Sequence, residues 1–285
     1  MPERGQRPRL SFEFFPPRSE QGAASLARVT QKLDELQPDF YSCTYGAGGS
    51  TRDGTKETVA QLRAGGHVTA PHLSIGADSE ETTFAMLEDY RSMGVDRIVA
   101  LRGDVPSGIG RARFRANAEA LVGRIRKHSG DHFHIEVAAY PEVHPDGKSP
   151  ASDLEFFQRK VDAGANSAIT QYFYNPHAYY DFVDRCEAAG VDIPVYPGIM
   201  PITSYEGLIR FSDNCGADVP RWLRKHLEAF ADDDDGLRRF GIETVSRLCD
   251  DLLSAGAPGL HFYTLNRWGA SRTICQNLGL ANRGE

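Results

Sequence analysis

The sequence predicts an α/β protein built as a single (β/α)8 barrel, the TIM barrel, with extra helices before the last strand. Three observations predict it. Short apolar runs alternate with amphipathic stretches along the whole chain, and eight such pairs occupy about 260 residues, the usual size of this fold. No Pro/Gly/Ser-rich linker or shift of composition divides the 285 residues. The same alternation is also compatible with a doubly wound parallel sheet.

Eight apolar runs, bounded by turn residues, predict the strands. In chain order they are Leu10–Phe15, Phe40–Thr44, Val68–Ser74, Arg97–Leu101, His134–Ala139, Ser167–Phe173, Val191–Gly198 and Gly259–Thr264.

Amphipathic stretches between these runs predict the helices. They are Glu20–Leu36, Arg52–Arg63, Ser79–Met93, Arg115–Lys127, Asp153–Ala163, His177–Ala189, Tyr205–Asn214, Pro220–Phe230, Leu237–Ala255 and Arg267–Asn277. Ser79 precedes an acidic first turn, as an N-cap does. Gly94, Gly164 and Gly190 each follow a helical stretch, where a left-handed C-cap is expected.

Composition excludes several classes of protein. The chain has 32 Lys and Arg against 39 Asp and Glu, and four of the acidic residues form the run Asp232–Asp235, which we expect to be a solvated helix start. With no basic excess, binding to nucleic acid is not expected. No uncharged apolar run approaches the roughly 18 residues of a membrane span. The five scattered cysteines form no Cys-x-x-Cys pair, which predicts free thiols and a cytoplasmic protein.

The barrel prediction also locates the chemistry, because active sites of this fold lie at the C-terminal ends of the strands. Polar and titratable residues gather at or just after nearly every predicted strand end. They include Glu13, Thr44, His72, Arg102, Gly103, Asp104, Tyr140, His144, Gln171, Tyr263 and Arg267.

Glu13 is a carboxylate within an apolar strand. The period of two places Leu10, Phe12 and Phe14 on the face toward the helices, so Ser11 and Glu13 are expected to point into the barrel. Burial there would raise the pKa of Glu13 toward the range of a general acid. A structural carboxylate bonded to a buried cation or backbone amide is the alternative.

Arg102, Gly103 and Asp104 follow another apolar strand. The glycine permits close approach of a ligand, and the two charges form either a binding site or a self-satisfied pair. Asp104 and Glu13 at one barrel mouth would allow two carboxylates to divide acid and charge-stabilising roles.

Other familiar motifs are absent. The Gly-rich segment Thr44–Thr51 is neither a Walker loop nor a complete G-x-G-x-x-G, and no G-x-S-x-G elbow occurs. His134, Glu142 and His144 fit no standard zinc spacing, so no metal is expected.

Several motifs, in order and with matching spacing from about residue 10 to 280, resemble those of the bacterial-type 5,10-methylenetetrahydrofolate reductase family. The segments are Ser11–Pro17, Thr44–Asp53, Ala70–Leu73, Ala100–Asp104, Ala139–Pro145, Lys160–Asn166, Ile169–Gln171, Pro197–Pro201 and His261–Arg267.

The resemblance implies a single catalytic TIM-barrel domain over residues 1–285, flexible over about 1–9, that binds FAD and forms a homo-oligomer. Such an enzyme passes a hydride from NADH or NADPH through the flavin, in a ping-pong cycle, to 5,10-methylenetetrahydrofolate. The 5-methyltetrahydrofolate produced supplies methyl groups for methionine synthesis. We expect no S-adenosylmethionine-binding regulatory domain.

The resemblance also implies roles for residues. Glu13 would be the general acid, Asp104 would favour the cationic folate intermediate beside the flavin, and Gln171 would contact folate and reorient for the nicotinamide. Phe211, Tyr263 and Arg267 match folate-side positions. The FAD positions are Thr44, His72, Arg102, Gly103, Asp104, Tyr140, His144, Asp153 and Lys160, with Arg102 and Lys160 suited to the pyrophosphate.

Two other classes of function remain open from the residues. One is another enzyme on the same barrel, such as a folate-dependent methyltransferase or an aldolase-like lyase. An aldolase needs a lysine at a strand end, and Lys160 instead falls in a helical pattern. The other is a non-catalytic folate- or flavin-binding protein, in which loss of Glu13, Asp104 or Gln171 would be expected.

Overall fold

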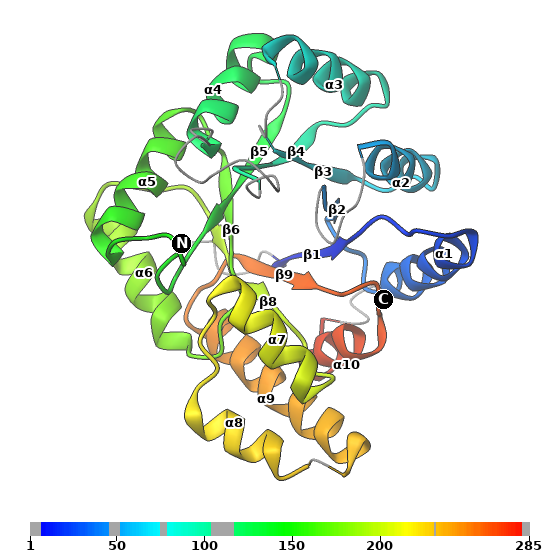
Figure 1. Cartoon of the computed structure of the whole chain (residues 1–285), viewed down its shortest axis with the longest axis vertical. Coiled ribbons are helices and arrows are strands. Elements are labelled where there is room, and N and C mark those ends of the chain that lie inside the picture. The colour runs from blue at the N-terminus through cyan, green and yellow to red at the C-terminus, as the bar shows by residue number, and fades with distance from the viewer. Residues whose placement is uncertain (1–6, 46–51, 75–78, 104–116, 231, 281–285) are drawn as a thin grey trace.

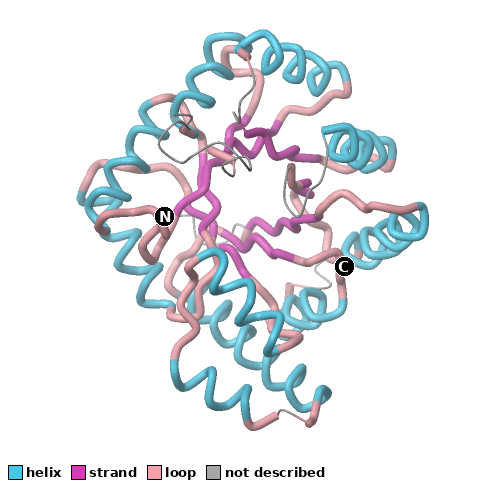
Figure 2. The backbone as a smooth tube through the Cα atoms, viewed as in Figure 1, coloured by secondary structure: helices cyan, strands magenta, loops and turns pink. Residues whose placement is uncertain are grey.

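The structure is a computed structural model that describes residues 7–45, 52–74, 79–103, 117–230 and 232–280. Its parallel strands form a ring that is surrounded by helices. Figure 2 shows the strands at the centre and the helices outside them. All strand pairings are parallel. The predicted α/β class and TIM-barrel architecture are therefore confirmed.

The elements follow the predicted order (Figure 1). The strands are β1 Arg9–Phe14, β2 Phe40–Cys43, β3 Thr69–Ser74, β4 Arg97–Leu101, β5 His134–Ala139, β6 Ser167–Thr170, β7 Val195–Tyr196, β8 Gly198–Ile199 and β9 Gly259–Tyr263. The helices are α1 Glu20–Asp34, α2 Arg52–Ala64, α3 Glu80–Ser92, α4 Ala118–Ser129, α5 Pro150–Asp162, α6 Pro176–Ala188, α7 Tyr205–Cys215, α8 Arg221–Glu228, α9 Asp234–Ser254 and α10 Gly269–Asn277. Three helices, α7 to α9, precede the last strand.

The barrel closes through one proline. The strand order is β7-β6-β5-β4-β3-β2-β1-β9-β8, so β7 and β8 lie at the two ends of the ladder. Pro197 alone separates them in the chain, and its carbonyl accepts a hydrogen bond from the backbone N–H of His261 at 3.0 Å. The chain thus leaves β6 as a partner at Tyr196 and takes β9 as a partner at Gly198.

This break is where the sequence prediction was wrong. We expected one strand over Val191–Gly198, but its first four residues lie outside any strand and the remainder is divided. Proline has no N–H to continue the ladder. A Cβ on Gly198 would meet the Thr170 carbonyl at 2.1 Å, so only glycine permits the close approach that moves the chain to its new partner. The sixth strand also ends earlier than expected, at Thr170.

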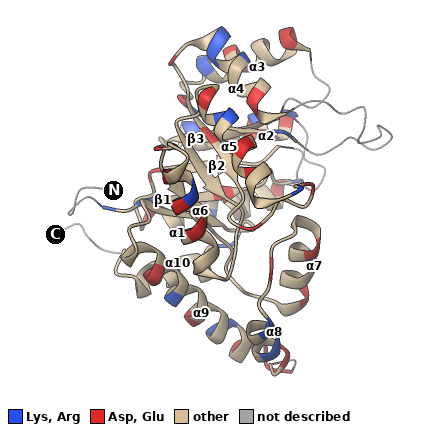
Figure 3. Ribbon diagram, turned by 90° about the vertical axis from the view of Figure 1, so that its left-hand side faces the viewer, with Lys and Arg blue, Asp and Glu red and all other residues tan. Residues whose placement is uncertain are grey.

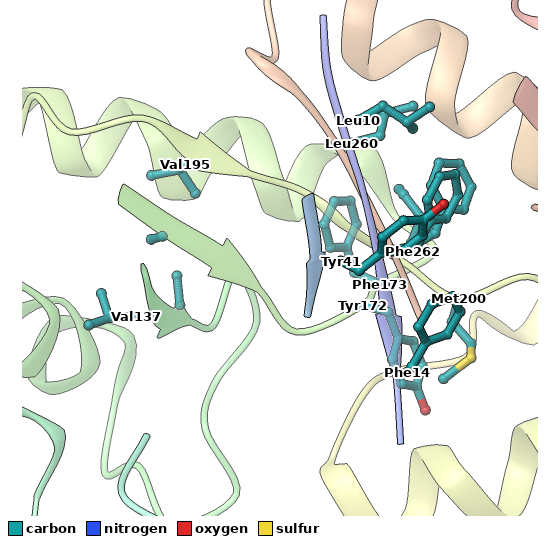
Figure 4. Close-up of a cluster of buried hydrophobic side chains, with 14 of the residues drawn as sticks. Leu10, Phe14, Tyr41, Val137, Tyr172, Phe173, Val195, Met200, Leu260 and Phe262 are labelled. Atoms are coloured by element: carbon teal, nitrogen blue, oxygen red, sulfur yellow. The ribbon is translucent and has the colours of Figure 1, made fainter. Parts of the chain in front are cut away.

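Alternation along each strand divides the apolar residues into two cores. Leu10, Phe12 and Phe14 face the helices, as predicted, and pack in the outer core with side chains from β9. Figure 4 shows Leu10, Phe14, Leu260 and Phe262 gathered beside β1 and β9. A smaller core fills the barrel itself with Phe40, Ala70, Val99, Ile169 and Tyr196. The barrel interior is therefore packed below its mouth.

Local sequence signals mark where helices begin and end, as the sequence predicted. Ser79 caps α3 by accepting a hydrogen bond from the Thr82 N–H. Gly94, Gly164 and Gly190 follow α3, α5 and α6 with φ angles of 72°, 112° and 73°, which glycine adopts without strain. The acidic run is exposed and starts α9, where the Asp233 side chain accepts from the Gly236 N–H.

A buried charge network occupies the N-terminal mouth of the barrel. Glu136 is fully buried on β5 and is bonded by Arg97 and by the Ser167 hydroxyl, with His134 at 3.4 Å and Arg9 at 3.7 Å. Arg9 and Arg97 also stack over the rings of Tyr196 and Phe40. Although burial opposes ionisation, bonds from His134, Arg97 and Ser167 lower the pKa of Glu136 to about 2.

Charged side chains on the outer surface are mixed in sign. Figure 3 shows Lys and Arg interspersed with Asp and Glu over the helices of one face. Within the described residues, no helix combines the length and apolar character needed to cross a membrane.

Replacing Glu136 with Gln should lower the free energy of unfolding at pH 7 by about 3 kcal/mol or more, because it leaves buried arginine uncompensated. The folded-state pKa lies below the ordinary 4.5, so this contribution is complete above pH 4.5 and is lost as the pH falls toward 2. Urea unfolding of both proteins across this range measures it. Glu155→Gln, in an exposed pair on α5, serves as the control. Equal stabilities of Glu136→Gln and the parent at pH 7 would contradict this.

Candidate active site

A large cavity opens at the C-terminal mouth of the barrel, where active sites of this fold lie. Its volume of about 700 Å³ falls within the range typical of small-molecule sites. Eight of the predicted site residues line it: Glu13, Thr44, His72, Gly103, Tyr140, Gln171, Phe211 and Tyr263. They come from seven strand ends or the loops that follow them, and from α7.

Glu13 lies between two buried histidines. Its Oε2 atom is 3.3 Å from Nε2 of His72 on β3 and 3.6 Å from Nε2 of His261 on β9. The other ring nitrogen of His261, Nδ1, hydrogen-bonds the Ser11 hydroxyl at 2.7 Å. The parallel register pairs Ser11 with His261 and Glu13 with Tyr263, which places these side chains together inside the barrel.

The expected rise in the pKa of Glu13 is wrong. Burial does act in that direction, but the charges and hydrogen bonds of His72 and His261 outweigh it and lower the pKa to about 2. The carboxylate is therefore ionised at neutral pH. Glu13 keeps about a fifth of its side chain exposed, so a ligand in the cavity can reach it.

A second group of predicted residues lies around the loop after β5. Arg102 binds Asp146 at 3.0 Å, and the Asp146 N–H donates to His144 Nδ1 at 2.9 Å. The His144 N–H donates to Asp153 at 2.7 Å. The His144 ring meets Tyr140 edge-on, with 4.5 Å between ring centroids. Tyr140 lines the large cavity, so this polar group lies beside it without forming its wall.

Lys160 belongs to the same region. It lies in α5, as its helical pattern predicted, and its ammonium donates to the Ala138 carbonyl. Burial lowers the pKa of Lys160 to about 8, and the nearby Asp153 opposes that shift. Burial and the charge of Arg102 also lower the pKa of His144. These groups form a largely preformed polar region beside the cavity.

Three predicted folate-side residues face the cavity from β6, α7 and β9. The amide oxygen of Gln171 accepts from the Tyr172 N–H at 3.0 Å. Phe211 lines the cavity and is more than a third exposed. Burial raises the pKa of Tyr263 well above its usual value, so its protonated hydroxyl donates to the Thr170 carbonyl at 2.7 Å.

Two further predicted residues are also not in the described wall. Arg267 lines a separate, smaller cavity after β9. Asp104 lies outside the described residues, as does most of the Gly-rich segment Thr44–Thr51.

Sequence reasoning missed His261 as a site residue. The signal was present, because in β9 the apolar residues Leu260 and Phe262 alternate with His261 and Tyr263, and we singled out only the residue at the strand end. It also missed three residues of the cavity wall: Tyr172, which closely follows β6, and Asn214 and Cys215, which lie on α7 away from the strand ends. No three His, Cys, Asp or Glu side chains in the described ranges are grouped to hold a metal ion.

Comparison with known sequences gives one consistent family. The profile of the family described as methylenetetrahydrofolate reductase matches residues 2–279. The 5,10-methylenetetrahydrofolate reductase of Salmonella typhimurium is 38% identical over 272 residues, which cover 95% of this chain and 90% of the relative. The methylenetetrahydrofolate reductase (NADH) 1 of Arabidopsis thaliana is 38% identical over 99% of this chain and 50% of its own length.

Comparison with solved structures supports the fold. An uncharacterized protein from Clostridium thermocellum, described as binding two copies of 5-methyl-5,6,7,8-tetrahydrofolic acid, superposes with a TM-score of 0.68. The alignment covers 96% of this chain and 93% of that one at 16% identity.

Replacing His261 with Asn should raise the pKa of Glu13 from about 2 toward its ordinary value, because one of the two groups that favour the carboxylate is removed. His72→Asn should act in the same direction. The measurement is a ¹³C NMR titration of the glutamate carboxyl groups, with Glu13→Gln to identify the resonance. If both histidine variants leave the midpoint unchanged, the histidines do not control this carboxylate.

Proposed function

The chain belongs to the methylenetetrahydrofolate reductase family, and from that membership we propose that it reduces 5,10-methylenetetrahydrofolate to 5-methyltetrahydrofolate with NADH or NADPH and FAD. The observation that carries this proposal is the large cavity, whose wall presents Glu13, the imidazole of His72 and the exposed ring of Phe211 at one barrel mouth. Pterin and flavin rings need such flat contacts together with a few fixed polar groups.

The residues on the β2–β5 side of the cavity fit FAD. The hydroxyl of Thr44 is buried with no hydrogen-bond partner among the described residues, so it remains available to a ligand, and the ring of His72 lies in the same cavity wall with Nε2 3.3 Å from Glu13. Gly103, at φ 79°, packs so closely on Ser74 that an added Cβ would lie 2.7 Å away, which holds the strand end against the cavity wall.

We assign Thr44, His72, Gly103 and Tyr140 to the flavin. The assignment extends to the polar group behind Tyr140, formed by Arg102, His144, Asp153 and Lys160, where the cations would face the pyrophosphate. When bound, FAD would supply hydride transfer between NAD(P)H and folate in two successive half-reactions.

Glu13 would deliver the proton that opens the methylene bridge of the folate. The leaving nitrogen takes the proton as its bond to the bridge carbon breaks, which yields the 5-iminium cation that accepts hydride. Because the free carboxylate is ionised, it must first gain a proton. His261, held by Ser11 on one side and near Glu13 on the other, can supply it. Ligands that cover the exposed part of Glu13 would favour its protonated form.

The remaining assignments concern the substrate. Gln171 would exchange its bond to Tyr172 for one to folate or nicotinamide, and Phe211 would stack on a substrate ring. Tyr263 would border the folate, and Asp104 would stabilise the iminium cation by its charge.

We place the enzyme, as a homo-oligomer, in the cytoplasm, where its five free thiols would stay reduced. Its product would supply methyl groups for methionine synthesis.

Anaerobic absorbance of the purified protein tests the cycle. Flavin bands should bleach with NADH or NADPH and return with methylenetetrahydrofolate. Glu13→Gln should keep flavin binding and bleaching, but its reoxidation by folate should slow by about 10²- to 10⁴-fold, the usual contribution of a general acid.

The control is Glu20→Gln, an exposed carboxylate at the start of α1. Reoxidation of Glu13→Gln at the parent rate would remove Glu13 as the acid. A protein that binds no flavin even when FAD is added would contradict the assigned cofactor.

A further inference from the structure

Helix α7 forms one side of the large cavity, although the rest of the described wall comes from strands or the loops that follow them. Phe211, Asn214 and Cys215 line the cavity from this helix. Leu208 and Ser212 are buried, and positions 208, 211, 212 and 215 repeat at the spacing of a single helix face, so this face is turned toward the barrel. The orientation of α7 therefore decides where the ring of Phe211 lies in the cavity.

A single hydroxyl group joins the side chains of α7 to the barrel. The phenol oxygen of Tyr172, just after β6, lies 3.1 Å from the Ser212 hydroxyl and accepts a hydrogen bond from the Cys215 thiol at 3.3 Å. Within the described ranges, every hydrogen bond between a side chain of α7 and a strand or its following loop ends on this oxygen. Burial raises the pKa of Tyr172 above its usual value, so the hydroxyl stays protonated.

The other end of the anchoring arrangement lies in the loop after β5, which holds the C-terminal end of α7. Gly216 ends the helix with a φ angle of 75°, and a Cβ added there would lie 2.7 Å from the ring of Pro145. Two residues later, the Asp218 N–H donates to the Glu142 carboxylate at 2.8 Å. These contacts fix where α7 ends, and the hydroxyl of Tyr172 fixes which face of the helix is turned to the cavity.

Tyr172 also contacts the two other residues assigned to the folate side of the cavity. Its backbone N–H donates to the amide oxygen of Gln171 at 3.0 Å, which holds that side chain until a ligand displaces it. Its ring meets Tyr263 nearly edge-on, with 6.3 Å between the ring centroids. Gln171, Tyr263 and the helix that carries Phe211 are thus all in contact with this one residue.

We propose that Tyr172 is a positioning residue for the folate, whose hydroxyl holds α7 so that the ring of Phe211 meets the substrate. This inference rests on the proposed folate substrate. Tyr172 acts through Phe211 and not on the reacting atoms. Loss of its hydroxyl should therefore weaken binding of folate but not of flavin, because the residues assigned to FAD lie on or after β2 to β5 and on α5.

Hydrogen exchange of the folate-free holoenzyme, read by mass spectrometry, tests the anchoring. Tyr172→Phe removes the hydroxyl and keeps the ring, so exchange over residues 205–215 should become faster while α5 is unchanged. Tyr179→Phe is the matched control, because it removes a similarly buried hydroxyl on α6 that donates to the Val195 carbonyl at 2.8 Å. It should leave α7 unchanged. Exchange over α7 that does not respond to Tyr172→Phe overturns the inference.

Anaerobic calorimetry with tetrahydrofolate tests the effect on the substrate, because this folate carries no one-carbon group and cannot reduce the flavin. Tyr172→Phe should weaken its binding to the holoenzyme about 3- to 10-fold, the scale of one buried hydrogen bond. The KM for methylenetetrahydrofolate should rise by more than kcat falls, with the flavin content and spectrum of the parent. In a Phe211→Ala background the same change should have no further effect on affinity, because the two residues act as one unit.

The outcomes separate this inference from the proposed reaction. Equal loss of affinity with and without the ring of Phe211 overturns the inference, because Tyr172 would then act by another route. A loss that disappears in the Phe211→Ala background supports it, even if no folate is reduced, in which case the proposed reaction fails alone. A parent protein that binds no tetrahydrofolate contradicts the proposed substrate and overturns both.

Discussion

The pairing of β1 with β9 is the contact on which the rest of the molecule depends. It joins the first strand of the barrel to the last, and it sets Ser11 beside His261 and Glu13 beside Tyr263. Without this register, a carboxylate inside an apolar barrel would lack one of its two imidazole neighbours, at a high desolvation cost. The same pairing positions the strained turn after β9, from which Arg267 and α10 extend. Closure of the fold and assembly of the site are thus one event.

The two barrel mouths place buried carboxylates in different surroundings. Glu136 is fully enclosed and bonded by arginine and serine, an arrangement that fixes strands to one another. Glu13 is partly exposed, lines the large cavity and faces two imidazoles. Both carboxylates have a pKa of about 2, yet only Glu13 can be reached by a ligand in the cavity. Access from the cavity, rather than the pKa, distinguishes a structural carboxylate from a candidate acid.

Most of the fold could be predicted from local patterns. Strand alternation predicted the faces of Leu10, Phe12 and Phe14, and the helix-stop glycines lie where expected. The divided seventh strand could not be predicted, because it depends on how closely Gly198 approaches Thr170 across the sheet. At the site, strand ends identified seven cavity residues, and Phe211 on α7 was predicted only from the family resemblance. The direction of the Glu13 pKa shift was mispredicted because His72 and His261 are distant in sequence and adjacent only after closure. Arg267 follows a strand end, but the left-handed turn before it carries the residue into another cavity.

The position of these groups along the chain has a consequence for synthesis on the ribosome. Ser11 and His261, which hydrogen-bond each other, are 250 residues apart, so nearly the whole polypeptide must emerge before they meet. Until then the first strand exposes one edge, and Glu13 lacks His261. A nascent or prematurely terminated chain that ends before β9 can therefore build most of the helices yet contain neither a closed sheet nor a complete site. Activity is acquired at the end of translation, in a single late step.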